Sequence, residues 1–226
     1  FIDGDDKDAV DQLNKQLMQT EITQPAVLAT DLSLTRLLAA YGVRPDMVMG
    51  HSLGEYAALV AAGSLSFASA LEAVSARGHE MAALTMEDNG AMAAVFAPIA
   101  EIDRVVAAAD GYVVVANVNS FSQAVIGGTT AAVTSVIDTF TQGGFTAVRI
   151  PVSHAFHTSI VAPVSAPLMD TLSRMDLRAP ELPIVANVDG EFYPTGAAAD
   201  AGMVDILGRQ VASPVQFVHG LETLYD

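Results

Sequence analysis

The chain has 226 residues, of which 51% are hydrophobic, and its formal net charge at pH 7 is −16. That length and hydrophobic fraction predict one globular domain with room for a small insertion. The negative charge argues against binding to nucleic acid or to an anionic membrane surface. The sequence has no cysteine, which excludes disulfides and thiolate catalysis. It has no apolar run long enough to span a membrane, and no signal-peptide pattern opens it, so we expect a cytoplasmic protein.

Helical periodicity dominates the first third of the chain. Apolar residues recur at helical spacing over residues 25–41, which predicts a helix with a proline near its start. A short apolar run at 47–49 predicts a strand, and strong helix formers follow over 55–62. Another helix is predicted over 66–81, with Ser66 as its N-cap.

Strand and helix patterns alternate farther along the chain. They predict a strand, a helix, two strands, a helix and a strand, over 91–96, 100–109, 112–117, 123–127, 130–142 and 145–150. This βαββαβ order is typical of a ferredoxin-like unit. A helix at 162–174, a strand at 184–187 and a helix at 203–211 then return to the larger layer. Residues 196–201 are expected to form a loop.

The insertion has recognisable borders. A polar stretch at 87–90 precedes its first strand, and Pro151 follows its last. We therefore expect an α/β core over residues 1–88 and 152–226, with an inserted α+β subdomain over 89–151.

The pattern Gly50-His51-Ser52-Leu53-Gly54 follows the short strand at 47–49. It matches the Gly-x-Ser-x-Gly nucleophile elbow, a sharp turn between a strand and a helix that exposes a serine. Side chains at the flanking glycines would block this turn. Ser52 is therefore the candidate nucleophile. The backbone N–H of Leu53, at the helix N-terminus, is expected to face a developing oxyanion.

A serine nucleophile needs a base, and the stretch 153–158 contains the histidines His154 and His157. A histidine in this loop fits the role of general base towards Ser52. A structural histidine remains the alternative for each. The two could also form a metal pair, but no third ligand stands at suitable spacing, so we expect no metal site.

Six motifs resemble the malonyl-coenzyme A:acyl carrier protein transacylase family, and especially the acyltransferase domains of multidomain polyketide or fatty acid synthases. They are Thr23-Gln24-Pro25-Ala26, Gly50-His51-Ser52-Leu53-Gly54-Glu55, Arg77-Gly78 with Met81, Asn117-x-Asn119-Ser120, His154-Ala155-Phe156-His157 and Ser213-Pro214-Val215-Gln216-Phe217. Their order is that of the family and they span nearly the whole chain. The resemblance implies an α/β fold, with an α/β-hydrolase-like core and an inserted ferredoxin-like α+β subdomain.

The resemblance also implies catalytic roles. Ser52 would be acylated and His157 would be its general base. Gln210 matches the position whose backbone carbonyl orients the catalytic histidine, which gives a dyad rather than the triad of hydrolases. Arg77 matches the arginine that pairs with the free carboxylate of a malonyl group, a planar two-point contact that lysine cannot copy.

Specificity follows from the same resemblance. The His154-Ala155-Phe156-His157 stretch resembles the malonyl-selecting form, because Phe156 would fill the space that an α-methyl group needs. Leu53 stands where a methylmalonyl-selecting relative has glutamine, which also indicates selection of malonyl. Such a steric filter contributes only about 1–3 kcal/mol. Gln24 and Asn119, which stand in two of the motifs, are expected to bind substrate together with His154.

The expected function is therefore the transfer of a malonyl group from coenzyme A to the phosphopantetheine arm of an acyl carrier protein, through an acyl-enzyme on Ser52. No tightly bound cofactor is expected, because the coenzyme A thioester is itself the substrate. Since the chain and carrier proteins are both acidic, we expect tethering on one polypeptide to favour their encounter. A serine hydrolase, such as an esterase or thioesterase, is the alternative, and a non-catalytic docking module is a third.

Two family features are not found in the sequence. The family usually begins with a strand and a Gly-Gln-Gly loop that supplies a second oxyanion donor, and it ends with a further Val-Gly-Pro-rich strand. We therefore expect the chain to be a fragment of a larger synthase.

Overall fold

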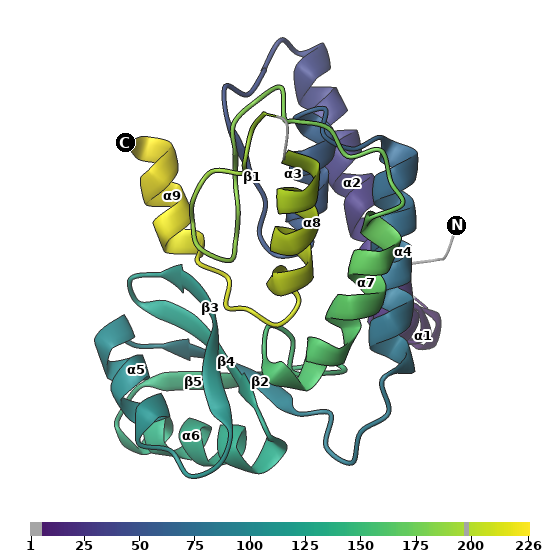
Figure 1. Cartoon of the computed structure of the whole chain (residues 1–226). Coiled ribbons are helices and arrows are strands. Elements are labelled where there is room, and N and C mark those ends of the chain that lie inside the picture. The colour runs from purple at the N-terminus through teal and green to yellow at the C-terminus, as the bar shows by residue number, and fades with distance from the viewer. Residues whose placement is uncertain (1–5, 197–198) are drawn as a thin grey trace.

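Two layers of different architecture make up the structure, a computed structural model that describes residues 6–196 and 199–226. We call them the helical layer and the sheet layer, the latter drawn in teal in Figure 1. The helical layer consists of α1 (Lys7–Leu17), α2 (Thr20–Ala40), β1 (Val48–Met49), α3 (Gly54–Ala61), α4 (Phe67–Ala83), the 3-10 helix η1 (Ser159–Val164), α7 (Ser165–Leu172), β6 (Ile184–Val185), α8 (Ala199–Gln210) and α9 (Phe217–Tyr225). The sheet layer consists of β2 (Ala91–Phe96), α5 (Ile99–Ala107), β3 (Val113–Ser120), β4 (Gln123–Gly128), α6 (Thr130–Gln142) and β5 (Thr146–Ile150).

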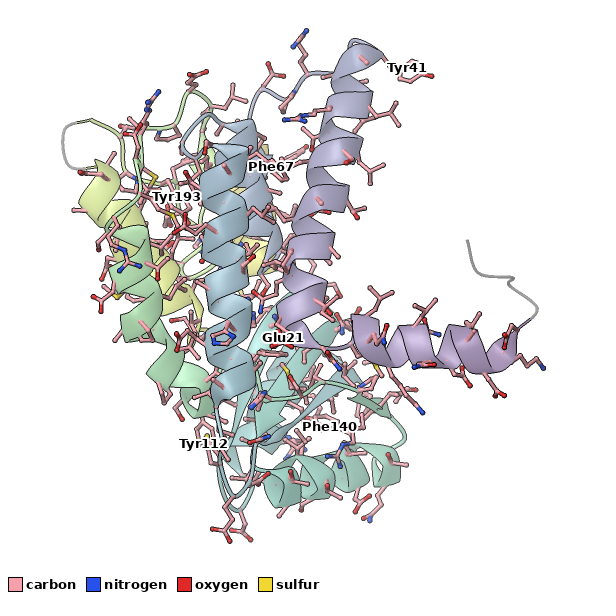
Figure 2. The ribbon with its side chains drawn as sticks, turned by 90° about the vertical axis from the view of Figure 1, so that its right-hand side faces the viewer. Glu21, Tyr41, Phe67, Tyr112, Phe140 and Tyr193 are labelled. Carbon is pink, nitrogen blue, oxygen red and sulfur yellow. The ribbon has the colours of Figure 1, made fainter. Side chains whose placement is uncertain are left out.

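The sheet layer has its strands in the order β3-β4-β2-β5, and every neighbouring pair is antiparallel. Side chains alternate between the two faces of β2, as a pleated strand requires. Ala93 and Val95 pack with Phe140 of α6, which Figure 2 labels in this layer. Met92 points to the other face and packs with Ala155, outside the layer. Both faces of the sheet are therefore covered, one by its own helices and one by the helical layer.

The helical layer is built around a parallel pair of short strands. Val48 of β1 pairs with Ile184 of β6, and the neighbouring helices bury a large apolar cluster against the pair. Val215 joins the two layers, because it accepts a hydrogen bond from Val118 N–H at 2.9 Å and donates one to the Ala116 carbonyl at 2.9 Å. This link extends the edge of β3 and fixes the segment before α9 against the sheet layer.

The βαββαβ order expected for residues 91–150 is confirmed, and Ser66 caps α4 by accepting a hydrogen bond from Ser69 N–H, as predicted. The boundaries at 89–151 stay a prediction. Helix α2 begins at Thr20, before the expected start, and continues through Pro25, which lacks the backbone N–H of an ordinary helical residue.

Two expectations for the helical layer were wrong, and two helices were missed. The helix expected over 162–174 is a 3-10 helix followed by α7, because Pro163 and Pro167 remove backbone donors. The loop expected at 196–201 is partly helix, since α8 begins at Ala199; residues 197 and 198 lie outside the described residues. Helices α1 and α9 were not predicted, although their apolar residues recur at helical spacing, so this signal in the sequence was missed. None of the described helices is long and apolar enough to cross a membrane.

Candidate active site

The turn between β1 and α3 holds Ser52 in the left-handed region, with φ = 53°. A Cβ on Gly50 would overlap the backbone of Gly54, so only glycine fits at the start of this turn. Asn187, which follows β6, holds the turn from both sides. Its Oδ1 accepts a hydrogen bond from Ser52 N–H at 2.5 Å, and its Nδ2 donates one to the Gly50 carbonyl at 2.6 Å. The geometry is that of a nucleophile elbow.

His157 brings its imidazole directly to this serine. Its Nε2 lies 2.7 Å from Ser52 Oγ. Its Nδ1 lies 3.0 Å from the Gln210 carbonyl and 3.2 Å from the Ser213 carbonyl. Because a carbonyl oxygen can only accept, Nδ1 carries the hydrogen, and Nε2 is left free to accept the serine proton.

The charge state of His157 follows from its surroundings. Burial lowers the pKa of its imidazole to about 3, and the positive charge of Arg77 adds to this effect. The ring is therefore neutral near pH 7, as a general base must be. No carboxylate contacts His157 within residues 6–196 and 199–226, so its orienting partners there are backbone carbonyls.

Arg77 is buried in α4 with 4% of its surface exposed. The next residue, Gly78, allows α2 to approach, since a Cβ there would lie 2.9 Å from Glu21 Cα. This close crossing places Gln24 of α2 beside the guanidinium, where its Oε1 accepts a hydrogen bond from Arg77 Nη1 at 2.8 Å. Gln24 Nε2 in turn donates to Thr20 Oγ1 at 2.8 Å. Among the described residues no partner meets Arg77 Nε, so the guanidinium retains capacity for an anion.

A cavity of about 290 Å³ joins these side chains. It lies between the helical layer and the face of the sheet that carries Met92. The lining residues include Gln24, Ser52, Leu53, Arg77, Met92, Asn117, Val125, Phe156 and His157. The structure therefore brings the candidate nucleophile, the candidate base and one buried cation to a single space of small-molecule size.

Leu53 lies at the N-terminus of α3, next to the nucleophile. Its backbone N–H forms no hydrogen bond with the part of the chain that the structure describes. A free N–H beside a nucleophile, at the positive end of a helix, suits a developing negative charge. Its role as an oxyanion donor stays a prediction.

Two predicted binding residues do not line this cavity. His154 is buried, with its Nδ1 3.1 Å from Ser153 Oγ, and its ring centroid lies 6.4 Å from that of Phe156, which does line the cavity. Asn119 lies at the end of β3, where its Oδ1 is 2.7 Å from Nε2 of His51. Asn119 also lines a separate hollow of about 650 Å³ beside α9.

Sequence reasoning missed three residues that hold the site together. Glu55 appeared only as a helix former within a motif, yet it is fully buried directly after the elbow. Asn187 and Tyr193 lie far along the chain, after β6. A polar residue at the carboxyl end of a buried parallel strand is a useful signal, and Asn187 carries it.

The fold and the site together define an α/β enzyme-like domain with a serine–histidine pair at a nucleophile elbow. The family model described as the acyl transferase domain matches residues 7–224. The chain belongs to this family, which confirms the resemblance and, at the level of the family, the expected acyltransferase class. The expected fold, an α/β-hydrolase-like core with an inserted ferredoxin-like subdomain, is confirmed as well.

Individual relatives come from two kinds of protein. The chain is 40% identical over 186 residues to the phenolphthiocerol synthesis polyketide synthase Pks15/1 of Mycobacterium marinum, covering 82% of this chain and 8% of that protein. It is 32% identical over 215 residues to the malonyl CoA-acyl carrier protein transacylase of Bacillus subtilis, covering 93% of this chain and 67% of that protein. The chain thus spans a small part of the synthases that it matches.

The solved structures that superpose on the chain are of the same two kinds of protein. The acyltransferase domain from the second module of the salinomycin polyketide synthase superposes with a TM-score of 0.82 at 36% identity, over 93% of this chain and 48% of that one. The acyl-carrier-protein S-malonyltransferase of Burkholderia pseudomallei has a TM-score of 0.86 at 34% identity, over 93% of this chain and 69% of that one.

Proposed function

We propose that this domain transfers a malonyl group from coenzyme A to the phosphopantetheine thiol of an acyl carrier protein, through an ester on Ser52. The observation that carries the proposal is the contact between Ser52 Oγ and His157 Nε2 at 2.7 Å, in a cavity that Arg77 also lines. The names of the relatives from Bacillus subtilis and Burkholderia pseudomallei support the malonyl group and the carrier protein as substrates.

The first half-reaction forms the ester. His157 Nε2 takes the proton from Ser52 Oγ as the oxygen attacks the thioester carbonyl. The Leu53 N–H then faces the negative oxygen of the tetrahedral intermediate. When the C–S bond breaks, the coenzyme A sulfur leaves with the proton that His157 had taken.

The second half-reaction is the reverse with a different thiol. The neutral imidazole of His157 takes the proton of the phosphopantetheine thiol, and the sulfur attacks the ester carbonyl. The C–O bond to Ser52 breaks and its oxygen regains the proton. The histidine is neutral at the start of both halves, in keeping with the pKa of about 3 to which burial lowers its imidazole.

Arg77 supplies the selection for malonyl. Its buried guanidinium can form a two-point contact with the free carboxylate of the acyl group. Gln24 keeps this guanidinium in place through the hydrogen bond at 2.8 Å. Phe156 lines the same cavity and would limit space at the α-carbon, which favours malonyl over methylmalonyl.

The test is to mix the full-length protein with malonyl-coenzyme A and to follow its intact mass. We expect one malonyl group per chain on Ser52 and then its loss upon addition of a carrier protein that bears phosphopantetheine. Malonyl on the carrier supports transfer, whereas free malonate with an unmodified carrier identifies a hydrolase. A protein whose mass does not change would contradict the proposal, and Ser52→Ala is the control for labelling at other sites.

A further inference from the structure

Glu55 is a fully buried carboxylate one turn from the nucleophile. Its Oε1 accepts hydrogen bonds from the Tyr193 hydroxyl and, at 3.4 Å, from the Asn187 backbone N–H. Its Oε2 accepts one from Gln210 Nε2 at 2.6 Å. No salt bridge to Glu55 is found among the described residues. Burying an ionisable group without a cation costs free energy. The proposed acyl transfer does not use the Glu55 carboxylate directly.

Two of these partners also contact the reacting pair. Asn187 places its side chain on both ends of the elbow, at Ser52 N–H and the Gly50 carbonyl. Gln210 donates from the same Nε2 to the Ser52 carbonyl at 2.9 Å, and its backbone carbonyl accepts from His157 Nδ1. The carboxylate of Glu55 thus connects the segment that carries the serine to the segment that orients the histidine.

We propose that Glu55 is a positioning residue, whose ionised carboxylate fixes Asn187 and Gln210 so that Ser52 Oγ and His157 Nε2 remain aligned. This inference depends on the proposed acyl transfer only for its substrate. The alignment itself concerns the reactivity of Ser52 towards any acylating or phosphonylating reagent.

The orientation of the Gln210 side chain explains why the ionised form is needed. Its Nε2 faces two acceptors, Glu55 Oε2 and the Ser52 carbonyl, while its Oε1 is buried without a partner within the described residues. A carboxylate can only accept, so it holds the amide this way round. A proton on Oε2 would face Nε2 donor to donor, and the amide would have to turn away from Ser52.

Burial makes the protonation of Glu55 relevant near neutral pH. Desolvation raises the pKa of its carboxyl to about 7, while the hydrogen bonds from Tyr193 and Gln210 lower it and the negative charge of Asp189 raises it. Tyr56 of its own helix has a pKa raised to about 12 and stays neutral. The cation of Arg77, in α4, also interacts electrostatically with the Glu55 carboxylate. Reactivity of Ser52 should therefore increase with pH through about 7, a range in which His157, with a pKa of about 3, does not titrate.

The experiment measures Ser52 acylation by malonyl-coenzyme A, and inactivation by a fluorophosphonate, between pH 5 and 9 in the full-length protein. In Glu55→Gln the amide has one acceptor oxygen, so it cannot accept the hydrogen bond from Gln210 Nε2 as well as those from Tyr193 and Asn187. We expect the acylation kcat to fall about 10- to 100-fold with KM changed less than about 2-fold, the scale of a small misalignment of reacting groups. The increase in rate near pH 7 should disappear in this variant. Tyr193→Phe, which keeps the carboxylate and its bond to Gln210, should lose less activity and retain the increase.

Tyr56→Phe is the matched control, because Tyr56 is the next residue of the same helix and its buried hydroxyl has no partner among the described residues. It should behave like the wild type. Equal rates and equal pH profiles for Glu55→Gln and Tyr56→Phe would overturn the inference. If malonyl-coenzyme A does not acylate the wild type, the proposed function fails, but the fluorophosphonate rates still decide the role of Glu55.

Discussion

Ser52 and His157 share an uncommon backbone conformation and meet at their side chains. They are the two non-glycine residues with positive φ in the described chain, at 53° and 59°, and Ser52 Oγ lies 2.7 Å from His157 Nε2. Left-handed backbone at a residue with a Cβ costs of order 1–3 kcal/mol, and it persists where the surroundings hold it. Asn187 and Gln210 hold it here, through hydrogen bonds to the backbone of Ser52.

Two substitutions at Ser52 should separate the effect of its strained backbone on stability from the role of its hydroxyl in acylation. Ser52→Gly removes the Cβ and should raise the free energy of unfolding by about 1 kcal/mol, since glycine adopts positive φ without strain. Ser52→Ala should leave stability nearly unchanged. Neither variant should form the malonyl ester. Denaturant unfolding and intact mass measure the two effects, and an acylated Ser52→Ala protein would show that another residue is the nucleophile.

Substitutions at His157 and at the nearby His154 should have very different effects on the rate of acylation. His157→Ala should slow acylation about 100-fold or more, the usual scale for loss of a positioned general base. His154→Ala should reduce acylation much less, because its side chain does not line the cavity, and it should chiefly loosen acyl selection through the contact with Phe156. Single-turnover rates with malonyl- and acetyl-coenzyme A measure both effects. If His154→Ala is the more severe variant, the base has been assigned to the wrong histidine.

Arg77 should decide between malonyl and neutral acyl groups. In Arg77→Ala the malonyl carboxylate would enter the cavity without a cation, a loss of about 3–5 kcal/mol. The malonyl-to-acetyl ratio of kcat/KM should then fall by about two to three decades or more. Arg77→Lys should recover only part of the ratio, because lysine cannot form the two-point contact. An unchanged ratio in Arg77→Ala would mean that the guanidinium does not bind the acyl group.

The buried imidazole should make the fold sensitive to acid. Its pKa is lowered from 6.5 to about 3, so between these values the unfolded chain holds a proton that folded His157 does not. Stability from this group is therefore complete above about pH 6.5 and is lost as the pH falls towards 3. Glu55 has the opposite sign, since its raised pKa makes stability fall as pH rises from 4.5 to about 7.

Comparison with His157→Gln cancels the contribution of Glu55, which is present in both proteins. The wild type should lose stability on acidification more steeply than this variant, by up to about 1.4 kcal/mol per pH unit. Urea unfolding at intervals from pH 6.5 to 4.5 measures the difference. Parallel curves for the two proteins would mean that the imidazole is not protected from protonation in the folded state.

The sequence predicted the elements whose signals are local. The elbow at Ser52 has its signal in five consecutive residues, and the alternating strands of the sheet layer have theirs in their own periodicity. The roles of Arg77 and Gln210 came from the resemblance to a family, since a helical arginine or glutamine has no such local signal. The contacts of Glu55 with Asn187 and Gln210 join residues more than a hundred positions apart in the chain. Periodicity and spacing contain no information on such pairs.

The walls of the cavity come from both layers, and they carry different tasks. Ser52, His157 and Arg77 belong to the helical layer, whereas Met92, Asn117 and Val125 reach the same space from β2, β3 and β4. The part of the wall contributed by the sheet contains none of the groups that move protons. Substitutions at Met92, Asn117 or Val125 should therefore change the shape of the cavity while Ser52, His157 and Arg77 stay in place. The space available to the acyl group can thus vary in the sheet layer while the proton-transfer groups and the Arg77 cation are kept, provided that the link at Val215 is retained.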